Sequence, residues 1–226
     1  MTTVHATRTG GLTTDRLQLI ARGKRLEYVT IAYNCIEGVV ALGTGLLAGS
    51  VALVGFGFDS GIEVFSALAL LWRLQSDADE ARRARIEKRA LRVVGASFLL
   101  LAAYVTLNSS RSLLFHLAPK SSSAGIVLAA ASVVVMPLLM RAKKRVARGL
   151  GSAALDADAT QTEFCAYLSA ILLAGLGLNA LFGWWWADSA AALVMVPLIV
   201  REGWEGICGV QCGNCCAGPG LANSKD

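Results

Sequence analysis

Long apolar stretches without charge, separated by short basic clusters, are the feature of this sequence that most restricts its fold. Between Glu163 and Asp188 no residue is acidic or basic, and the same holds for residues 125–140. Over the whole chain 55% of the residues are hydrophobic and 16% are charged, whereas about a quarter of the residues in a soluble domain are charged. The pattern is typical of a helical membrane protein that crosses the bilayer several times.

Each apolar stretch is close to the ~20 residues that a helix needs to cross about 30 Å of hydrocarbon. We expect three parts: a basic N-terminal segment (1–27), a membrane domain (28–205) and a Cys-rich tail (206–226). The first 26 residues are polar and basic and predict no cleavable signal peptide. The sequence therefore predicts an all-α integral membrane protein with six transmembrane helices, over residues 28–48, 51–72, 91–114, 125–140, 154–178 and 185–200.

The basic residues predict how the chain is oriented in the membrane. They gather in residues 8–25, 73–92 and 141–148, whereas the connections on the opposite side hold only Arg111 and Lys120. Because Lys and Arg are enriched in cytoplasmic loops, both termini are expected in the cytoplasm, with the protein in a plasma or inner membrane. The net charge of +5 then reflects topology and contact with anionic lipid, and requires no nucleic-acid partner.

The second expected span carries two acidic residues, Asp59 and Glu63, in the stretch "GFGFDSGIEVFSALALLW". Residues four apart lie on one face of a helix, so both carboxylates point toward one place near the middle of the membrane. Like charges there repel unless a cation lies between them or one carboxylate is protonated. The pair therefore predicts a site for a metal ion, for protons, or for both. The alternative is a packing role, in which an acid pairs with a basic residue of another helix; no Lys or Arg lies well inside an expected span.

A second group of polar residues lies near the start of the fifth expected span. Asp158, Gln161 and Cys165 follow one another at i, i+3 and i+7, which again places them on one helix face. A Cys thiolate is a soft ligand for Zn²⁺ and related ions, and the Gln carbonyl is a neutral oxygen ligand. A lone Cys in an apolar helix is otherwise a small packing residue. Glu163 points elsewhere on the same helix and has no assigned role.

The first expected span also contains an acid, Glu37, near mid-membrane. It is a candidate accessory ligand, proton carrier or gate. A hydrogen bond to a neighbouring helix is an equally good interpretation.

The tail contains four cysteines within the stretch "CGVQCGNCC". On the cytoplasmic side, structural disulfides are not expected. Dense Cys tracts in that compartment commonly bind metal, and a soft-metal scavenger that feeds the membrane site is one hypothesis. Palmitoylation is the alternative. The candidate tail ligands are Cys208, Cys212, Cys215 and Cys216.

Taken together, three stretches of this chain resemble the transmembrane domain of the cation diffusion facilitator family. They are "SVALVGFGFDSGIE", "ADATQTEFCAYLSAILL" and "GWWWADSAAALVMVPLIV". The resemblance implies a six-helix transporter that exchanges a divalent metal ion for protons as a homodimer. It also implies that Asp59 and Glu63 match the acidic pair of the family's second helix, and that Gln161 and Cys165 take the places of the His and Asp of its fifth.

The departures from the family pattern concern the metal and the tail. A carboxylate and thiolate site without histidine favours Zn²⁺ and also allows softer Cd²⁺ or Hg²⁺, besides the Co²⁺, Mn²⁺ or Fe²⁺ that the family carries. The family's fifth-helix histidine, which titrates near neutral pH, is absent from this sequence. The acids or Cys165 would therefore have to bind and release the exchanged protons. We also expect the Cys-rich tail in place of the family's usual C-terminal cytoplasmic domain.

The function expected from the sequence is divalent metal efflux by metal/proton antiport through a midplane site on the second and fifth helices. The alternative is a membrane thiol-redox or metal-sensing protein that acts through the tail cysteines. A purely structural scaffold leaves the mid-membrane acids unexplained. No nucleophile–base pair or nucleotide-binding loop points to an enzyme, and no cofactor beyond the transported ion is expected.

Overall fold

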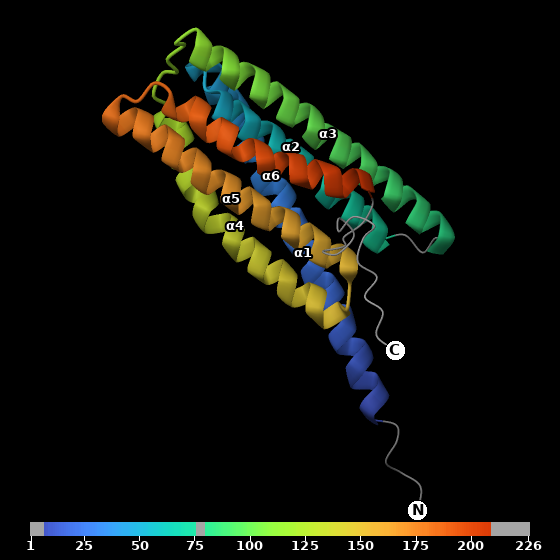
Figure 1. The fold of residues 1–226 in the computed structure, drawn as a ribbon. Coiled ribbons are helices and arrows are strands. Elements are labelled where there is room, and N and C mark those ends of the chain that lie inside the picture. Colours follow the sequence, from blue (N-terminus) through green and yellow to red (C-terminus); the bar gives the residue numbers. More distant parts are fainter. Residues whose placement is uncertain (1–6, 76–79, 209–226) are drawn as a thin grey trace, which may run out of the picture.

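The structure, a computed structural model, describes residues 7–75 and 80–208, with side chains over 16–72, 92–152 and 154–208. This part of the chain is entirely helical apart from short connections. The six helices run in an up-and-down order (Figure 1). They are α1 (Thr7–Ala48), α2 (Val51–Gln75), α3 (Glu80–Leu114), α4 (Ser123–Leu150), α5 (Ala153–Phe182) and α6 (Ala187–Cys208).

Local capping explains why the helices end where they do. Ser122 precedes α4 and accepts a hydrogen bond from the Gly125 backbone N–H at 3.0 Å, which satisfies one of the free donors of the first turn. At the other end of α4, Gly151 adopts the left-handed conformation with φ of 61°, a geometry that glycine accepts without strain. Ser152 then caps α5 directly. The connection is therefore so short that α4 and α5 form an antiparallel hairpin.

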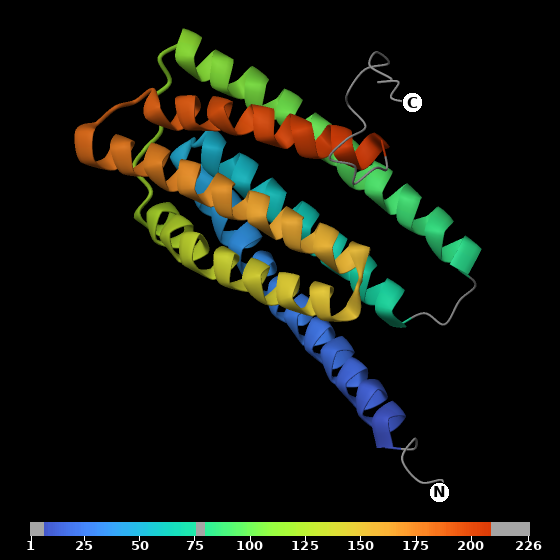
Figure 2. The ribbon, with the colours of Figure 1, turned by 60° about the horizontal axis from the view of Figure 1, so that its bottom comes forward.

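Helices α1, α2, α4 and α5 surround a common interior, and α3 and α6 form a pair beside them (Figures 1 and 2). Each helix of the four contacts two others of the group, in the ring order α1, α2, α5, α4. The α3–α6 pair packs against this bundle through α2 and α5. The core between the helices is built by large apolar side chains such as Phe56, Met136, Leu172 and Leu176.

Glycines allow some of the helices to approach backbone to backbone. A Cβ atom at Gly95 of α3 would lie 2.6 Å from the Gly203 carbonyl oxygen of α6, so no larger residue fits there without separating the two helices. At the contact of α1 with α2, a Cβ atom at Gly57 would lie 2.9 Å from the Leu42 backbone nitrogen. Close packing through small residues is characteristic of helices in membranes.

The distribution of side chains confirms the integral membrane protein expected from the sequence. Large apolar residues such as Leu47, Leu114 and Leu181 are more than three-quarters exposed on the outside of the bundle, whereas carboxylates are buried inside it. That arrangement suits a lipid environment. Among the residues that the structure describes, five of the six helices are long and apolar enough to cross a membrane. In α6 the uncharged stretch is shorter, from Ser189 to Val200.

Several helices continue past the expected spans. Helix α1 begins at Thr7 rather than at residue 28, and α4 continues to Leu150 rather than ending at residue 140. The extension of α4 matters for the site, because it carries Lys143 in helical conformation into contact with the interior of the bundle.

Candidate cation site

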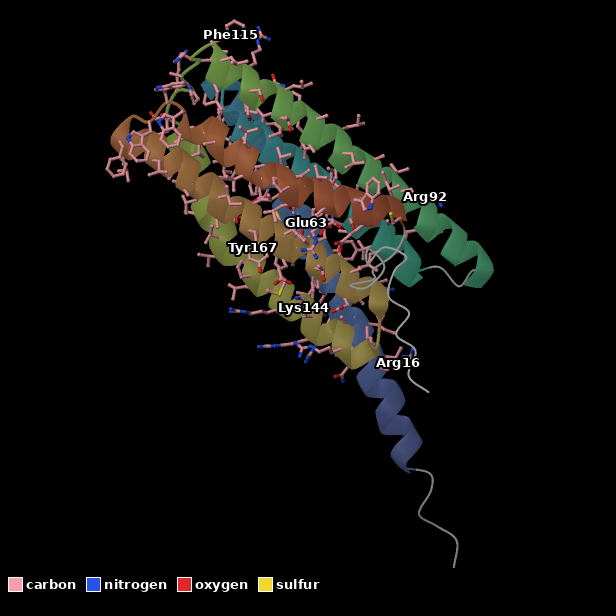
Figure 3. The ribbon with its side chains drawn as sticks, viewed as in Figure 1. Arg16, Glu63, Arg92, Phe115, Lys144 and Tyr167 are labelled. Atoms are coloured by element: carbon pink, nitrogen blue, oxygen red, sulfur yellow. The ribbon has the colours of Figure 1, made fainter. Side chains whose placement is uncertain are left out.

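The interior of the four-helix bundle holds an excess of carboxyl groups. Glu63, which lies about midway along the bundle in Figure 3, is 1% exposed. The buried carboxyl groups of the bundle interior come from α1, α2 and α5, and Lys143 is the one buried basic side chain among those the structure describes. Unpaired charge in such a place is unfavourable, so the excess of acid suits the binding of cations or protons. The acids are Glu27, Glu37, Asp59, Glu63 and Asp158.

The two acids of α2 and one thiol of α5 converge within this interior. Asp59 and Glu63 lie one helical turn apart, and the buried side chain of Cys165 interacts with both carboxyl groups. One oxygen of each acid, Asp59 Oδ2 and Glu63 Oε2, is buried without a hydrogen-bond partner. The family resemblance implied that the helices carrying these three residues face each other, and the structure brings the three side chains together. We call Asp59, Glu63 and Cys165 the central cluster.

The central cluster is not a ready-formed metal site. Within the described part of the chain, no three His, Cys, Asp or Glu side chains are already arranged so that they could hold one metal ion. Two carboxylates that face each other without a cation repel. A metal ion bound by this cluster would therefore have to draw the side chains closer together.

Asp158, the next expected ligand, is engaged elsewhere. Its Oδ2 atom lies 2.5 Å from the Lys143 Nζ atom of α4, and Glu27 of α1 lies 3.3 Å from the same ammonium. Lys143 and Glu27 are fully buried and Asp158 almost so. No Lys or Arg was expected well inside a span, and the fourth expected span ended at residue 140, three residues before Lys143. The basic cluster after that span was interpreted as a connection, whereas α4 continues through it and carries Lys143 to the buried acids.

Thr162 connects this ion pair to the central cluster, and the sequence analysis missed it. Its hydroxyl donates to Glu63 Oε1 at 2.8 Å, and the Lys143 ammonium donates to the same hydroxyl at 3.2 Å. Thr162 lies four residues after Asp158 and three before Cys165, so helical spacing alone could have placed it on the same face. Gln161, the expected ligand, is partly buried, and its Nε2 atom has no hydrogen-bond partner.

Glu37 is held by hydroxyl groups from two other helices. Ser60 of α2 donates to Glu37 Oε2 at 2.8 Å, and Ser132 of α4 donates to the other carboxyl oxygen. The Tyr33 hydroxyl lies 2.9 Å from the Ser132 hydroxyl and extends the network. The carboxyl group of Glu37 is also near enough to act electrostatically on Glu63. The structure thus gives Glu37 the hydrogen bonds to neighbouring helices that the sequence allowed, beside the acids of α2.

Two further acids lie near the end of the bundle at which α4 ends and α5 begins. Glu163, which had no assigned role, pairs with Lys144 at 2.5 Å and accepts a hydrogen bond from Tyr167 at 3.1 Å. Glu202 of α6 is close enough to act electrostatically on Asp59, and its Oε1 atom is buried without a hydrogen-bond partner. Neither acid was among the expected ligands.

At the opposite end of the bundle, an acid of α6 positions the helix that carries Asp59 and Glu63. Asp188 accepts hydrogen bonds from the Ser50 hydroxyl and, at 3.0 Å, from the Val51 backbone N–H. Both donors lie at the start of α2, where the first N–H groups have no partner within the helix. Asp188 therefore fixes the beginning of α2 against α6.

The tail can be followed only at its first cysteine. Cys208 is exposed at the end of α6. Cys212, Cys215 and Cys216 lie outside the described residues, so the predicted tail metal site stays a prediction.

Comparison with known protein families gives one match. A family model described as the cation efflux transmembrane domain matches residues 28–207. The match covers all six helices except the first part of α1 and the last residue of α6. It therefore includes every residue of the central cluster, together with Lys143 and Asp158, and begins one residue after Glu27.

Proposed function

The chain belongs to the cation efflux family of transmembrane transporters, and on that premise we propose that it exports a divalent metal ion in exchange for protons. The single observation that carries the proposal is the central cluster. Two carboxyl groups of α2 and a thiol of α5 meet inside the bundle, and the acids keep unpartnered oxygens. Groups of this kind are ligands for divalent ions.

The transported ion binds to Asp59 and Glu63 through carboxylate oxygen and to Cys165 through sulfur. Zn²⁺ accepts this mixture of ligands, and the thiolate also favours softer Cd²⁺ and Hg²⁺. Co²⁺, Mn²⁺ and Fe²⁺ suit the carboxylates better than the thiolate. Gln161 has an unpartnered Nε2 atom and completes the ligand set by turning its Oε1 atom toward the ion, whereas Asp158 has to leave Lys143 before it can contribute.

Proton exchange follows from the same acids. Without a metal ion, neighbouring carboxyl groups in a low-dielectric interior hold protons, because two ionised groups would repel. A divalent ion displaces those protons when it binds, since ligands must be deprotonated to coordinate metal. Glu37, held by Ser60 and Ser132 next to Glu63, accepts a displaced proton.

The placement of the basic residues gives the orientation of the bundle, and the efflux family gives the direction of transport. The basic residues of 16–25 and 141–148 lie toward the same end of the bundle, where α1 enters it and α4 ends (Figure 1). The positive-inside rule makes that end cytoplasmic. The ion enters there and leaves at the end marked by Asp188. A homodimer in a plasma or inner membrane is the expected assembly.

The test is metal uptake into proteoliposomes under a pH gradient, with Zn²⁺, Cd²⁺ and Hg²⁺ supplied in turn. Asp59→Asn and Glu63→Gln are expected to lower the flux at least tenfold, whereas Asp156→Asn, an exposed acid of α5, leaves it unchanged. Flux that persists in both variants of α2 would contradict the proposal. Flux that instead disappears when the four tail cysteines are changed to serine would favour the thiol-redox or sensing function.

A further inference from the structure

Lys143 is unusual because it is a fully buried cation on a helix that faces the transport site. Its Nζ atom lies 2.5 Å from Asp158 Oδ2 and 3.3 Å from Glu27 Oε2. These partners come from α5 and α1, so one ammonium holds three helices together. A buried ammonium is stable only with such partners.

The carboxyl groups around Lys143 have more binding capacity than the ammonium uses. Asp158 Oδ1 and Glu27 Oε1 are buried without a hydrogen-bond partner. Thr162 adds a hydroxyl oxygen 3.2 Å from the ammonium and connects to Glu63 at 2.8 Å. Two acids and a hydroxyl around one position are a set of oxygen ligands that suits a cation.

We propose that Lys143 is a resident cation that occupies a second cation position, formed by Glu27, Asp158 and Thr162. The inference rests on the proposed function, because it concerns where the transported ion can bind. A divalent ion is repelled from a position already held by an ammonium. Lys143 thereby confines the transported ion to the central cluster, which the Thr162 hydroxyl connects to this second position.

Loss of the ammonium should therefore open a second site for the metal ion. Lys143→Gln removes the charge and leaves Glu27 and Asp158 facing each other, and an added divalent ion relieves their repulsion. Lys144→Gln is the matched control. Lys144 is the next residue of α4, but it pairs with Glu163 in a contact where both side chains are 29% exposed.

The experiment counts Cd²⁺ ions bound per chain by equilibrium dialysis of the full-length protein in detergent. All variants carry serine at the four tail cysteines, so that the tail binds no metal. The full-length protein that carries only the tail substitutions is expected to bind one ion per chain, and so is the Lys144→Gln variant. Lys143→Gln is expected to bind two, and Lys143→Arg, which keeps the charge, is expected to bind one.

A Lys143→Gln protein that is folded and still binds one ion per chain would overturn the inference. If that variant does not fold, the same titration is made with Lys143→Gln combined with Glu27→Gln, which removes one charge of each sign. This variant is expected to bind a second ion at least tenfold more weakly than the first, and a count of one would again overturn the inference.

The proposed function fails by a different result. Asp59→Asn is expected to abolish binding of the first ion, whatever residue stands at position 143. If Asp59→Asn leaves that ion bound, the central cluster is not the transport site. In that case, the number of Cd²⁺ ions that Lys143→Gln binds beyond the unchanged protein still shows whether the second position binds metal.

Discussion

The contact of Asp188 with the start of α2 leads to a specific prediction about stability. Asp188 is 1% exposed and accepts hydrogen bonds from the Ser50 hydroxyl and from the Val51 N–H at 3.0 Å. The Ala52 N–H lies farther from the carboxylate, at 3.5 Å. Asp188→Ala would leave the two stronger donors without their partner at the buried end of a helix.

The magnitude follows from these contacts. A hydrogen bond to a charged group contributes about 1.5–3 kcal/mol, and a carboxylate at a helix N-terminus contributes about 0.3–1 kcal/mol through the helix dipole. Counting only the Ser50 and Val51 donors, and taking the lower values because water can replace part of the interaction, gives a loss of about 3 kcal/mol. Asp188→Asn keeps one acceptor oxygen and should lose about half as much.

Reversible unfolding in mixed detergent micelles, followed by tryptophan fluorescence, measures this loss. Asp156→Ala is the control, because Asp156 is an exposed acid in the first turn of α5 and should lose less than about 1 kcal/mol. Because α2 carries Asp59 and Glu63, metal affinity should fall together with stability in Asp188→Ala. If Asp188→Ala lowers the free energy of unfolding no more than Asp156→Ala does, the capping role is refuted.

Three further predictions concern the interior contacts. Thr162→Val removes the hydroxyl bonded to Glu63 and should lower the free energy of unfolding by about 1–3 kcal/mol, whereas Thr162→Ser should restore it; equal thermal unfolding of the two variants would contradict the contact. Gly95→Val places side-chain atoms against the Gly203 carbonyl and should lower the melting temperature by separating α3 from α6, and an unchanged melting temperature would argue against backbone contact there. Glu37→Gln should reduce the number of protons released per metal ion bound, measured with a pH-sensitive dye in weak buffer, and an unchanged number would exclude Glu37 as a proton acceptor.

Much of the fold could be predicted from the sequence, because hydrophobic length and helical spacing are local properties. The uncharged stretches predicted six helices, and the four-residue spacing of Asp59 and Glu63 placed both acids on one buried face. The interaction of these acids with Cys165 of α5 joins two helices, and the family resemblance implied it where helical spacing could not. The inferences from hydrophobic length and from four-residue spacing need only the geometry of a single helix.

The ion pair of Lys143 could not be predicted in the same way. Lys143 continues the buried face of α4, four residues after Leu139, but it belongs to a basic cluster that was interpreted as a connection. Only the packing of α1 and α5 against α4 brings Glu27 and Asp158 to its ammonium. The cap of α2 by Asp188 likewise joins residues far apart in the chain. Contacts of this kind depend on the tertiary arrangement, because periodicity within one helix does not identify the partner on another.

The most direct test of the account is the coordination of a bound metal ion. X-ray absorption at the cadmium edge is measured on the protein with serine at the four tail cysteines, which leaves Cys35 and Cys165 as the remaining thiols. The account predicts one sulfur neighbour with oxygen neighbours, and it predicts that Cys165→Ser removes the sulfur whereas Cys35→Ser keeps it. A bound ion with oxygen neighbours alone, or with sulfur retained in Cys165→Ser, would contradict the central cluster as the transport site.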